Sequence, residues 1–440
     1  MTKVGFISLG CSKNLVDTEV MLKALYDAGF EITPDETEAE IIIVNTCGFI
    51  ESAKSESIEN ILDVAKLKEW GKCRHIIATG CLVERYREEV MRELPELDGI
   101  LGVGSLSDIV EACRAVLRGE KYTSFKDKNE SKLGGERILT TADHTAYLKI
   151  AEGCDNKCTY CAIPMIRGRL RSRKIEDIVA EARDLEALGV KELNLIAQDT
   201  SRYGLDIYGE YSLAKLVRAI SESTDIPWIR LLYCYPDKIT DELIAEMKSN
   251  PKLLHYMDIP IQHISDSVLT RMNRHGGKSL IIETIEKLRR EIPDVVLRTT
   301  AMVGFPGESE ADFEELCEFV KQTRFERFGA FTYSEEEGTV AAELDGKLDG
   351  QTKQDRYDIL MQTQLTVTEE QNLSKVGKIF KVLCDGFDTV AEVYYGRSYA
   401  DAPDVDGRVY FTSKEKIASG EFVEVKITEA LDYDLVGHAL

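Results

Sequence analysis

The chain of 440 residues is long enough for two or three domains, each with its own hydrophobic core. Its net charge of −23 disfavours the binding of nucleic acid and favours that of basic partners, if the surface is taken as a whole. A local basic groove that binds RNA is still compatible with this net charge. It has no run of about 18 apolar residues and no apolar signal segment at its start, so we expect a cytoplasmic protein without membrane contact.

Residues 1–120 alternate short apolar runs with stretches of helical periodicity. The predicted strands are 4–9, 41–44, 75–79 and 99–103. Strands that alternate with helices, such as the one expected over 107–117, form parallel βαβ units. We therefore predict a doubly wound parallel α/β domain. Residues 121–144 are polar and weakly periodic, and we interpret them as a linker.

Residues 145–373 contain six further apolar runs, separated by amphipathic helical stretches. The predicted strands are 147–151, 192–197, 228–233, 256–261, 295–303 and 327–333. Six βα repeats are too few for a closed eight-fold barrel, so we predict an open, partial (β/α)6 barrel with its functional residues at the carboxyl ends of the strands. In residues 374–440, short alternating runs predict a small antiparallel β-barrel of OB-like size.

Three closely spaced cysteines follow the first barrel strand: Cys154, Cys158 and Cys161. The chain holds eleven cysteines and no export signal, which indicates reduced thiols available for metal or catalytic work. Thiolates favour iron–sulfur clusters or zinc, and three of them leave one iron of a 4Fe–4S cluster open. The amino and carboxylate groups of S-adenosylmethionine fit that open iron, and an electron from the reduced cluster would release a 5′-deoxyadenosyl radical.

The spacing of this triad, with Tyr160 before the last cysteine, resembles the radical S-adenosylmethionine superfamily. Two other interpretations remain for the same three thiols. They could form a structural zinc site together with Cys234 or a histidine, or they could hold the cluster of a ferredoxin-like electron carrier.

A second set of cysteines is separated in sequence but shares one place in the predicted sheet. Each follows the end of a predicted strand: Cys11, Cys47 and Cys81. The carboxyl ends of parallel strands share one edge of a sheet, so three thiolates would converge on a second cluster. Each has a glycine neighbour that would let the backbone approach an inorganic ligand: Gly10, Gly48 and Gly80. The alternative is three inert buried cysteines.

Other residues at the predicted barrel rim are candidate ligand contacts. The candidates for S-adenosylmethionine are Gln198, Thr200, Gln262, Gly304 and Gly307. For the two glycines the alternative is an ordinary Gly/Pro turn. Four arginines that follow the triad are a candidate clamp for substrate carboxylates: Arg167, Arg169, Arg171 and Arg173. The alternative for them is a solvated charged face.

With both triads placed, the chain resembles the methylthiotransferases over its whole length. That family combines an N-terminal three-cysteine cluster domain, a radical S-adenosylmethionine barrel and a C-terminal TRAM barrel. The resemblance maps the ligands of an auxiliary 4Fe–4S cluster and of the radical-generating 4Fe–4S cluster onto Cys11, Cys47, Cys81, Cys154, Cys158 and Cys161. The run from Ser8 to Glu19 is similar to the branch that acts on ribosomal protein. The tRNA branch typically has Gln-Met-Asn where this chain has Ser12-Lys13-Asn14.

The resemblance implies methylthiolation of the β-carbon of an aspartate in small-subunit ribosomal protein S12, free or in the ribosomal subunit. It also implies two 4Fe–4S clusters, S-adenosylmethionine and an electron donor such as flavodoxin or ferredoxin. Residues 375–440 carry 8 basic and 12 acidic side chains, a balance that suits a lysine-rich protein better than tRNA. The alternatives are methylthiolation of a tRNA adenosine and a non-enzymatic iron–sulfur carrier.

Overall fold

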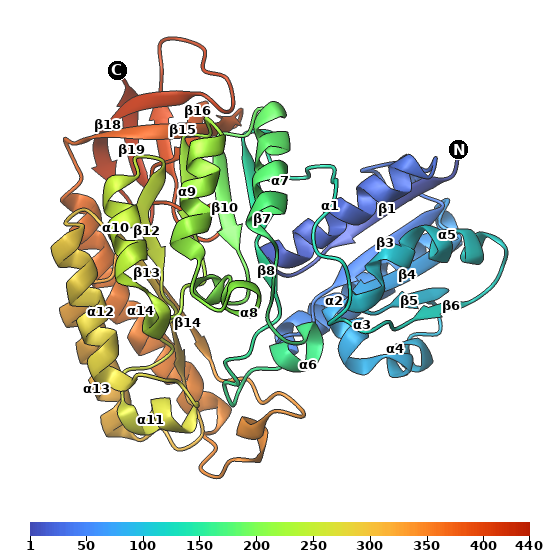
Figure 1. Ribbon diagram of the computed structural model, residues 1–440, viewed down its shortest axis with the longest axis horizontal. Coiled ribbons are helices and arrows are strands. Elements are labelled where there is room, and N and C mark those ends of the chain that lie inside the picture. The colour runs from blue at the N-terminus through green and yellow to red at the C-terminus, as the bar shows by residue number, and fades with distance from the viewer.

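The computed structural model describes residues 1–440, with a parallel α/β domain beside a half-open barrel and a small β-barrel above it (Figure 1). The N-terminal sheet has the strand order β2-β1-β3-β4-β5-β6, and all of its pairs are parallel. Its strands are β1 Lys3–Ser8, β2 Glu31–Ile32, β3 Ile41–Thr46, β4 His75–Gly80, β5 Gly99–Leu101 and β6 Tyr122–Ser124. The order reverses direction between β1 and β3, which makes the domain doubly wound as predicted.

Helices cover both faces of this sheet. They are α1 Ser12–Asp27, α2 Glu51–Trp70, α3 Cys81–Tyr86, α4 Glu88–Glu93 and α5 Ile109–Leu117, with short 3-10 turns at Glu36–Glu38 and Val103–Asp108. Side chains of α1 and α5 pack on one face, and those of α2 and α3 pack on the other. Every residue of β3 is buried, because a central parallel strand with helices on both sides has no solvated face.

One boundary differs from the prediction. Residues 122–124, assigned to the linker from sequence, form β6 and pair in parallel with β5. The segment Tyr-Thr-Ser is too short and too polar to show a strand pattern, and only its place at the sheet edge makes it a strand. The connection between the first two domains therefore begins after Ser124.

The central domain is an open six-stranded parallel sheet in the order β14-β13-β12-β11-β10-β7, which confirms the partial (β/α)6 barrel. Its strands are β7 Thr145–Lys149, β10 Glu192–Ile196, β11 Trp228–Leu231, β12 Leu253–Asp258, β13 Val296–Val303 and β14 Arg327–Thr332, and a separate pair is formed by β8 Ala151–Glu152 and β9 Arg171–Ser172. The two short strands tie the first triad's loop to the chain that follows α6.

The helices of the central domain are α6 Ile163–Arg167, α7 Ile175–Ala187, α8 Leu205–Tyr208, α9 Leu213–Ser223, α10 Asp241–Ser249, α11 Asp266–Arg271, α12 Gly277–Glu291, α13 Glu310–Thr323 and α14 Gly350–Leu373. Three 3-10 turns lie at Thr200–Arg202, Pro236–Lys238 and Val340–Glu343. The long helices cover the outer face of the sheet, seen at the left of Figure 1, and share a core of 45 buried residues with it.

The C-terminal domain is a closed barrel with the strand order β15-β16-β17-β19-β18. Its strands are β15 Ile379–Asp388, β16 Val393–Arg397, β17 Val409–Thr412, β18 Phe422–Ala430 and β19 Leu435–Ala439. The antiparallel prediction holds for every pair except β17 with β19, which run parallel. The reason is the long connection from β17 to β18, after which the β18–β19 hairpin returns β19 in the direction of β17.

This barrel packs against the amino ends of the central strands. Its segment 398–406 reaches the inner face of the sheet, where Asp401 pairs with Arg327 at the start of β14. Tyr256 on β12 donates a hydrogen bond of 2.6 Å to Asp406. The opposite, carboxyl ends of the strands stay free for a functional site.

Candidate functional site

The first triad lies in the loop between β8 and α6, at the carboxyl end of β7. Cys154, Cys158 and Cys161 are all partly exposed. Burial raises the pKa of the Cys161 thiol, and the nearby Cys158 and Cys154 raise it further. Burial likewise raises the pKa of Cys154 to about 12, with Cys158 among the neighbours that contribute. Cys158 acts on both Cys154 and Cys161, which indicates that the three side chains lie near one another.

An aromatic side chain after β11 and a cationic side chain after α11 hold Cys158. The Tyr235 hydroxyl lies 2.6 Å from the Cys158 sulfur. The guanidinium of Arg274 lies 3.8 Å from the centroid of the Tyr235 ring, and Arg274 also donates to the Pro260 carbonyl. Neither residue was predicted from the sequence, because no local pattern links them to a cysteine about 80 or more residues away.

The loop of the first triad is also anchored to the end of β10. Asn156 donates a hydrogen bond of 2.7 Å to Asp199, which also accepts from Ser201. Burial raises the pKa of Asp199. The anchor fixes the backbone between Cys154 and Cys158.

The second triad lies where the sequence placed it, after three adjacent strands of the N-terminal sheet. Cys11 follows β1, Cys47 follows β3, and Cys81 begins α3 directly after β4. Burial raises the pKa of Cys81 to about 12, and the neighbouring thiols Cys11 and Cys47 add to the rise. The influence of Cys11 and Cys47 on Cys81 indicates that the three side chains lie near one another at the edge where these strands end.

Cys11 differs from the other two thiols in its electrostatics. Desolvation by the surrounding protein raises its pKa, but the positive charges of Lys13 and Arg167 lower it by more, so the net pKa is lowered. Lys13 itself lies 3.4 Å over the ring of Tyr233, at the end of β11. A thiol that ionises readily is a better metal ligand.

The three glycines beside this triad lie against other parts of the protein. A Cβ on Gly10 would lie 2.8 Å from the Cys47 sulfur, and one on Gly48 would lie 2.7 Å from the Leu82 backbone nitrogen. A Cβ on Gly80 would overlap the Asn45 side chain. These glycines allow close packing within the protein, and Gly10 specifically makes room for a cysteine.

The donor chemistry of both triads fits iron–sulfur clusters. Each triad offers thiols and no imidazole or carboxylate, and soft thiolates are the standard ligands of such clusters. No three histidine, cysteine or carboxylate side chains are arranged to share one metal ion.

A cavity of about 460 Å³ joins Cys11 to the inner face of the barrel. All three domains contribute to its wall, with Tyr233 and Asp258 from strand ends and Asp404 from the C-terminal domain. Arg298 also faces the cavity and pairs with Asp258 at 3.0 Å. The cavity gives a substrate side chain room to reach the second triad from the barrel.

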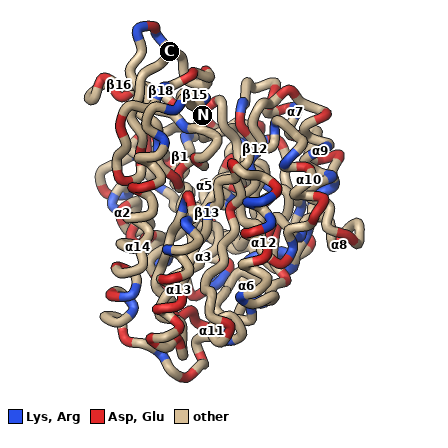
Figure 2. The backbone as a smooth tube through the Cα atoms, turned by 90° about the vertical axis from the view of Figure 1, so that its left-hand side faces the viewer, with Lys and Arg blue, Asp and Glu red and all other residues tan.

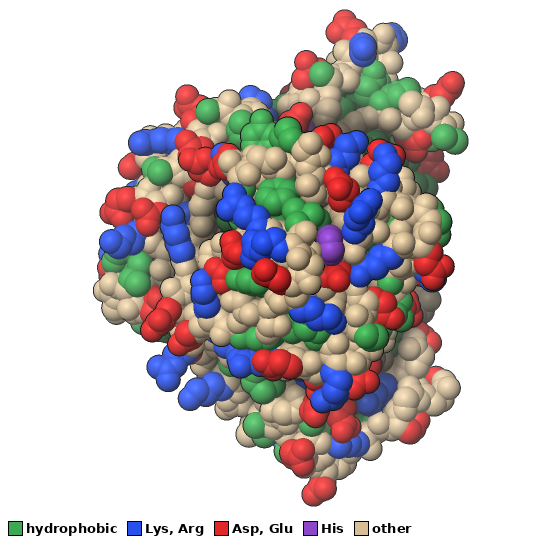
Figure 3. Space-filling model, turned by 90° about the vertical axis from the view of Figure 1, so that its right-hand side faces the viewer, with side chains coloured by type: hydrophobic (Ala, Val, Ile, Leu, Met, Phe, Trp, Pro, Cys, Tyr) green, Lys and Arg blue, Asp and Glu red, His purple; other side chains and the backbone are tan.

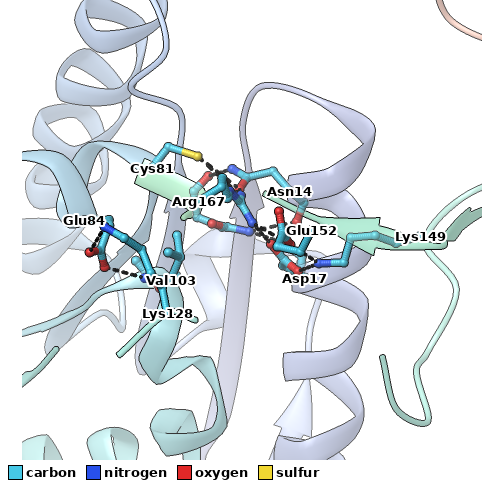
Figure 4. A network of polar contacts seen from close by, with 12 residues as sticks. Asn14, Asp17, Cys81, Glu84, Val103, Lys128, Lys149, Glu152 and Arg167 are labelled. Carbon is cyan, nitrogen blue, oxygen red and sulfur yellow. Dashed lines mark hydrogen bonds and ion pairs between the residues drawn. The ribbon is translucent and has the colours of Figure 1, made fainter. Parts of the chain in front are cut away.

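The arginines predicted to bind substrate fall into two groups. Arg167 is buried and pairs with Asp17 and Glu152, and Arg173 is buried and pairs with Glu181 (Figure 4 shows Arg167). Arg171 is partly buried and donates to the Ser131 carbonyl, whereas Arg169 is exposed. A four-arginine clamp does not form, because carboxylates of the protein itself already pair with two of the guanidinium groups.

The predicted cofactor contacts also differ among themselves. Gln198 and Gln262 each keep a buried side-chain oxygen without a hydrogen-bond partner. Thr200 donates to the Leu232 carbonyl within the protein. The space in front of Gly304 is filled by the Lys353 side chain, and that in front of Gly307 by the Arg271 side chain. The two amides retain hydrogen-bonding capacity for a ligand, while the other three residues are engaged.

Charge on the surface is mixed. Acidic and basic residues are both scattered along the backbone (Figure 2), and the face that contains the N-terminal domain shows both signs side by side (Figure 3). No helix of the structure is both long enough and apolar enough to span a membrane. The net charge of −23 is thus spread over the molecule.

Family models match the three domains in turn. They are the uncharacterized protein family UPF0004 over residues 3–102, the radical SAM superfamily over 148–320 and the TRAM domain over 376–440. The ribosomal protein uS12 methylthiotransferase RimO of Thermoanaerobacter sp. (strain X514) is 51% identical over 99% of this chain and 100% of its own length. The protein of the same name from Desulforamulus reducens is 49% identical over 99% of both chains. The chain belongs to the uS12 methylthiotransferase family.

Membership of this family confirms the resemblance seen in the sequence and makes the chain a radical S-adenosylmethionine enzyme. The fold is shared more widely. The radical S-adenosylmethionine methyltransferase TsrM of Kitasatospora setae superposes with a TM-score of 0.55 at 15% identity, over 75% of this chain and 73% of its own. At that identity the likeness concerns the fold alone.

Proposed function

We propose that this chain methylthiolates the β-carbon of an aspartate in ribosomal protein uS12. What supports the proposal is that one chain carries two sets of three cysteines at strand ends: Cys154, Cys158 and Cys161 after β8, and Cys11, Cys47 and Cys81 after β1, β3 and β4. One set suffices for radical generation alone. The second set, whose Cys11 lines the cavity that reaches the barrel, would serve sulfur insertion.

We assign Cys154, Cys158 and Cys161 to the radical-generating 4Fe–4S cluster and Cys11, Cys47 and Cys81 to the auxiliary 4Fe–4S cluster. When bound, the first cluster would supply an electron for the cleavage of S-adenosylmethionine, and the second would supply a site for sulfur. The protein positions the two thiol sets: Asn156 and Tyr235 hold the loop of the first, and the ends of three adjacent strands hold the second.

Residues of the chain also prepare the ligand sites. The free oxygens of Gln198 and Gln262 are suited to accept hydrogen bonds from S-adenosylmethionine, since a buried acceptor without a partner is costly unless a ligand satisfies it. The exposed Arg169 is the remaining candidate for a substrate carboxylate among the predicted arginines. Residues of all three domains line the cavity beside Cys11, so a substrate bound there would contact each domain.

The proposal includes two partners and a location. The substrate is ribosomal protein uS12, free or within the small subunit, and the acidic C-terminal domain suits its basic surface. A small electron carrier such as flavodoxin or ferredoxin supplies the reducing electron. Both partners place the enzyme in the cytoplasm.

Mass spectrometry of ribosomes and tRNA from cells that lack this protein tests the substrate. We expect the target aspartate of uS12 to lose about 46 mass units, the difference between a methylthio group and the hydrogen that it replaces, while tRNA nucleosides stay unchanged. Restoring the gene should restore the modification, and a gene with Cys11, Cys47 and Cys81 replaced by alanine should not. Retention of the modification on uS12 with loss of a methylthio group from a tRNA adenosine would make the tRNA alternative correct.

A further inference from the structure

Arg167 ends α6, six residues after Cys161, yet its guanidinium reaches a cysteine of the other triad (Figure 4). Its Nη2 donates to the Cys81 sulfur over 3.3 Å. The side chain is only 3% exposed. One guanidinium is therefore joined by the chain to the first triad and by a hydrogen bond to the second.

Carboxylates from two domains hold the guanidinium in place. Nη1 donates to Asp17 of α1 over 2.6 Å and to Glu152 of β8 over 3.3 Å, and Nη2 also donates to Asn14 over 2.6 Å. Lys149 pairs with the same two carboxylates. A buried cation without partners would be strongly destabilising, but here two cations face two carboxylates and the group is neutral in sum.

The partners of Arg167 exclude a role in binding a substrate anion. Its contact with the Cys81 sulfur is then the interaction that remains to be explained. Its ion pairs are internal, so no charge remains to attract a ligand. Arg167 is the cation within hydrogen-bond distance of the Cys81 sulfur. In the loaded enzyme that sulfur would be a thiolate bound to iron, and an N–H group aimed at it would bind the more negative, reduced form of the cluster more tightly.

We infer that Arg167 is a positioning residue for the auxiliary cluster, which raises the reduction potential of that cluster through its hydrogen bond to Cys81. This inference rests on the proposed function, since it requires a cluster on Cys11, Cys47 and Cys81. Hydrogen bonds to ligand sulfur are one of the main ways in which a protein sets the potential of such a cluster. The same contact fixes α6, and with it the first triad, against the sheet that carries the second.

A purely structural role would predict that any buried arginine at this domain contact behaves alike. Arg137 provides the matched control. It is also 3% exposed, and its Nη1 donates to Glu19 of α1 over 2.7 Å. Its partners are the carboxylates of Glu19 and Glu181. The two arginines share burial and a carboxylate on the same helix, and they differ in the contact with sulfur.

The test uses the full chain with Cys154, Cys158 and Cys161 replaced by alanine, reconstituted with iron and sulfide, so that the auxiliary cluster is the one observed. Its midpoint potential is measured by redox titration with detection by electron paramagnetic resonance. We expect Arg167→Lys and Arg167→Gln to shift the potential to more negative values at unchanged iron content, and Arg137→Lys to leave it where it was. Equal potentials in all four proteins would overturn the inference.

A second measurement leaves residue 167 intact and so remains decisive if the Arg167 variants fail to bind iron. The same chain is labelled with ¹⁵N-arginine, and the reduced cluster is examined by pulsed electron paramagnetic resonance. We expect a weak ¹⁵N coupling that survives in Arg137→Lys, and its absence would overturn the inference. A chain that binds no iron at this triad refutes the proposed function, whereas one that binds iron without coupling or shift refutes the role of Arg167 alone.

Discussion

Arg397 of the C-terminal barrel donates to Glu192 at the start of β10, and the Glu192 side chain is completely buried. Arg230 on β11 donates to the other oxygen of the same carboxylate over 3.0 Å. The two cations lower the pKa of Glu192, although burial alone would raise it. One carboxylate thus joins the small barrel to the amino ends of the central strands.

We expect Arg397→Met to lower the free energy of unfolding by about 3 kcal/mol, because it leaves a buried carboxylate with only one of its two cationic partners. Denaturant unfolding of the iron-free chain measures this change. Arg408→Met is the control, since Arg408 is exposed on the same barrel, and it should change the stability by less than about 0.5 kcal/mol. Replacing Glu192 by Gln together with Arg397→Met should recover part of the loss; no recovery would mean that the carboxylate is not what the arginine stabilises.

The two triads should be separable by substitution. Replacing Cys11, Cys47 and Cys81 by alanine should abolish sulfur insertion and leave some formation of 5′-deoxyadenosine from S-adenosylmethionine. Replacing Cys154, Cys158 and Cys161 should abolish both. Anaerobic analysis of the reconstituted proteins should give about eight irons per chain for the parent and about four for each variant. Equal loss of 5′-deoxyadenosine in both sets would contradict the division of roles.

Tyr235→Phe tests the hydroxyl that lies beside Cys158. The substitution keeps the ring under Arg274 and removes the group 2.6 Å from the sulfur. Loss of a group that orients a metal ligand typically costs 10-fold or more, so we expect 5′-deoxyadenosine to form about 10-fold more slowly at equal iron content. Tyr399→Phe, which loses a hydroxyl contact with the Asp294 carbonyl far from both triads, is the control. Equal rates in the two variants would exclude a role for the Tyr235 hydroxyl.

The sequence predicted the fold class and both cysteine sets for different physical reasons. The first triad is recognised by the local spacing of its cysteines, which all lie in one loop after a single strand. The second triad is predictable because parallel strands bring their carboxyl ends to one edge of the sheet. Cys11, Cys47 and Cys81 follow three strands that are adjacent in the structure. Periodicity was enough for this step, since β3 and β4 are buried apolar runs that cannot be mistaken for loops.

What sequence could not supply is the pairing of charges across domains. Arg167 was expected to bind substrate because its partner Asp17 lies 150 residues away and nothing local reveals it. Tyr235 and Arg274 were not predicted for the same reason. Their role depends on the tertiary contacts that join Cys158, Tyr235 and Arg274. The role of a charged group depends on its tertiary neighbours, whereas strands and local metal motifs can be recognised from consecutive residues.

Gln198→Leu tests the predicted contact with S-adenosylmethionine. The Nε2 group of Gln198 donates to Glu152 over 2.6 Å, and its Oε1 atom has no partner. Loss of one hydrogen bond of about 1.4 kcal/mol should raise the dissociation constant of S-adenosylmethionine about 10-fold in equilibrium binding to the reconstituted protein. Gln364→Leu removes another buried amide, one that packs by the Phe325 carbonyl on the outer side of the barrel, and it should not affect binding. A dissociation constant unchanged by Gln198→Leu would place the cofactor elsewhere.

The buried network around Glu152 should make the stability of the iron-free chain depend on acid pH. Burial raises the pKa of Glu152, but Lys149 and Arg167 lower it by more, from 4.5 to about 2. Because the folded pKa lies below the unfolded one, the stabilisation is fully present above pH 4.5 and is lost as the pH falls to about 2.

A shift of this size corresponds to about 3 kcal/mol. We therefore expect Glu152→Gln to be less stable than the parent by about that amount at pH 7, and the difference to shrink steadily between pH 4.5 and pH 2. Urea unfolding of the iron-free proteins at a series of pH values measures it. Glu424→Gln, which alters an exposed carboxylate of the C-terminal barrel, should follow the parent throughout. A difference for Glu152→Gln that stays constant down to pH 2 would show that packing, and not the charge of Glu152, holds α1 against the barrel.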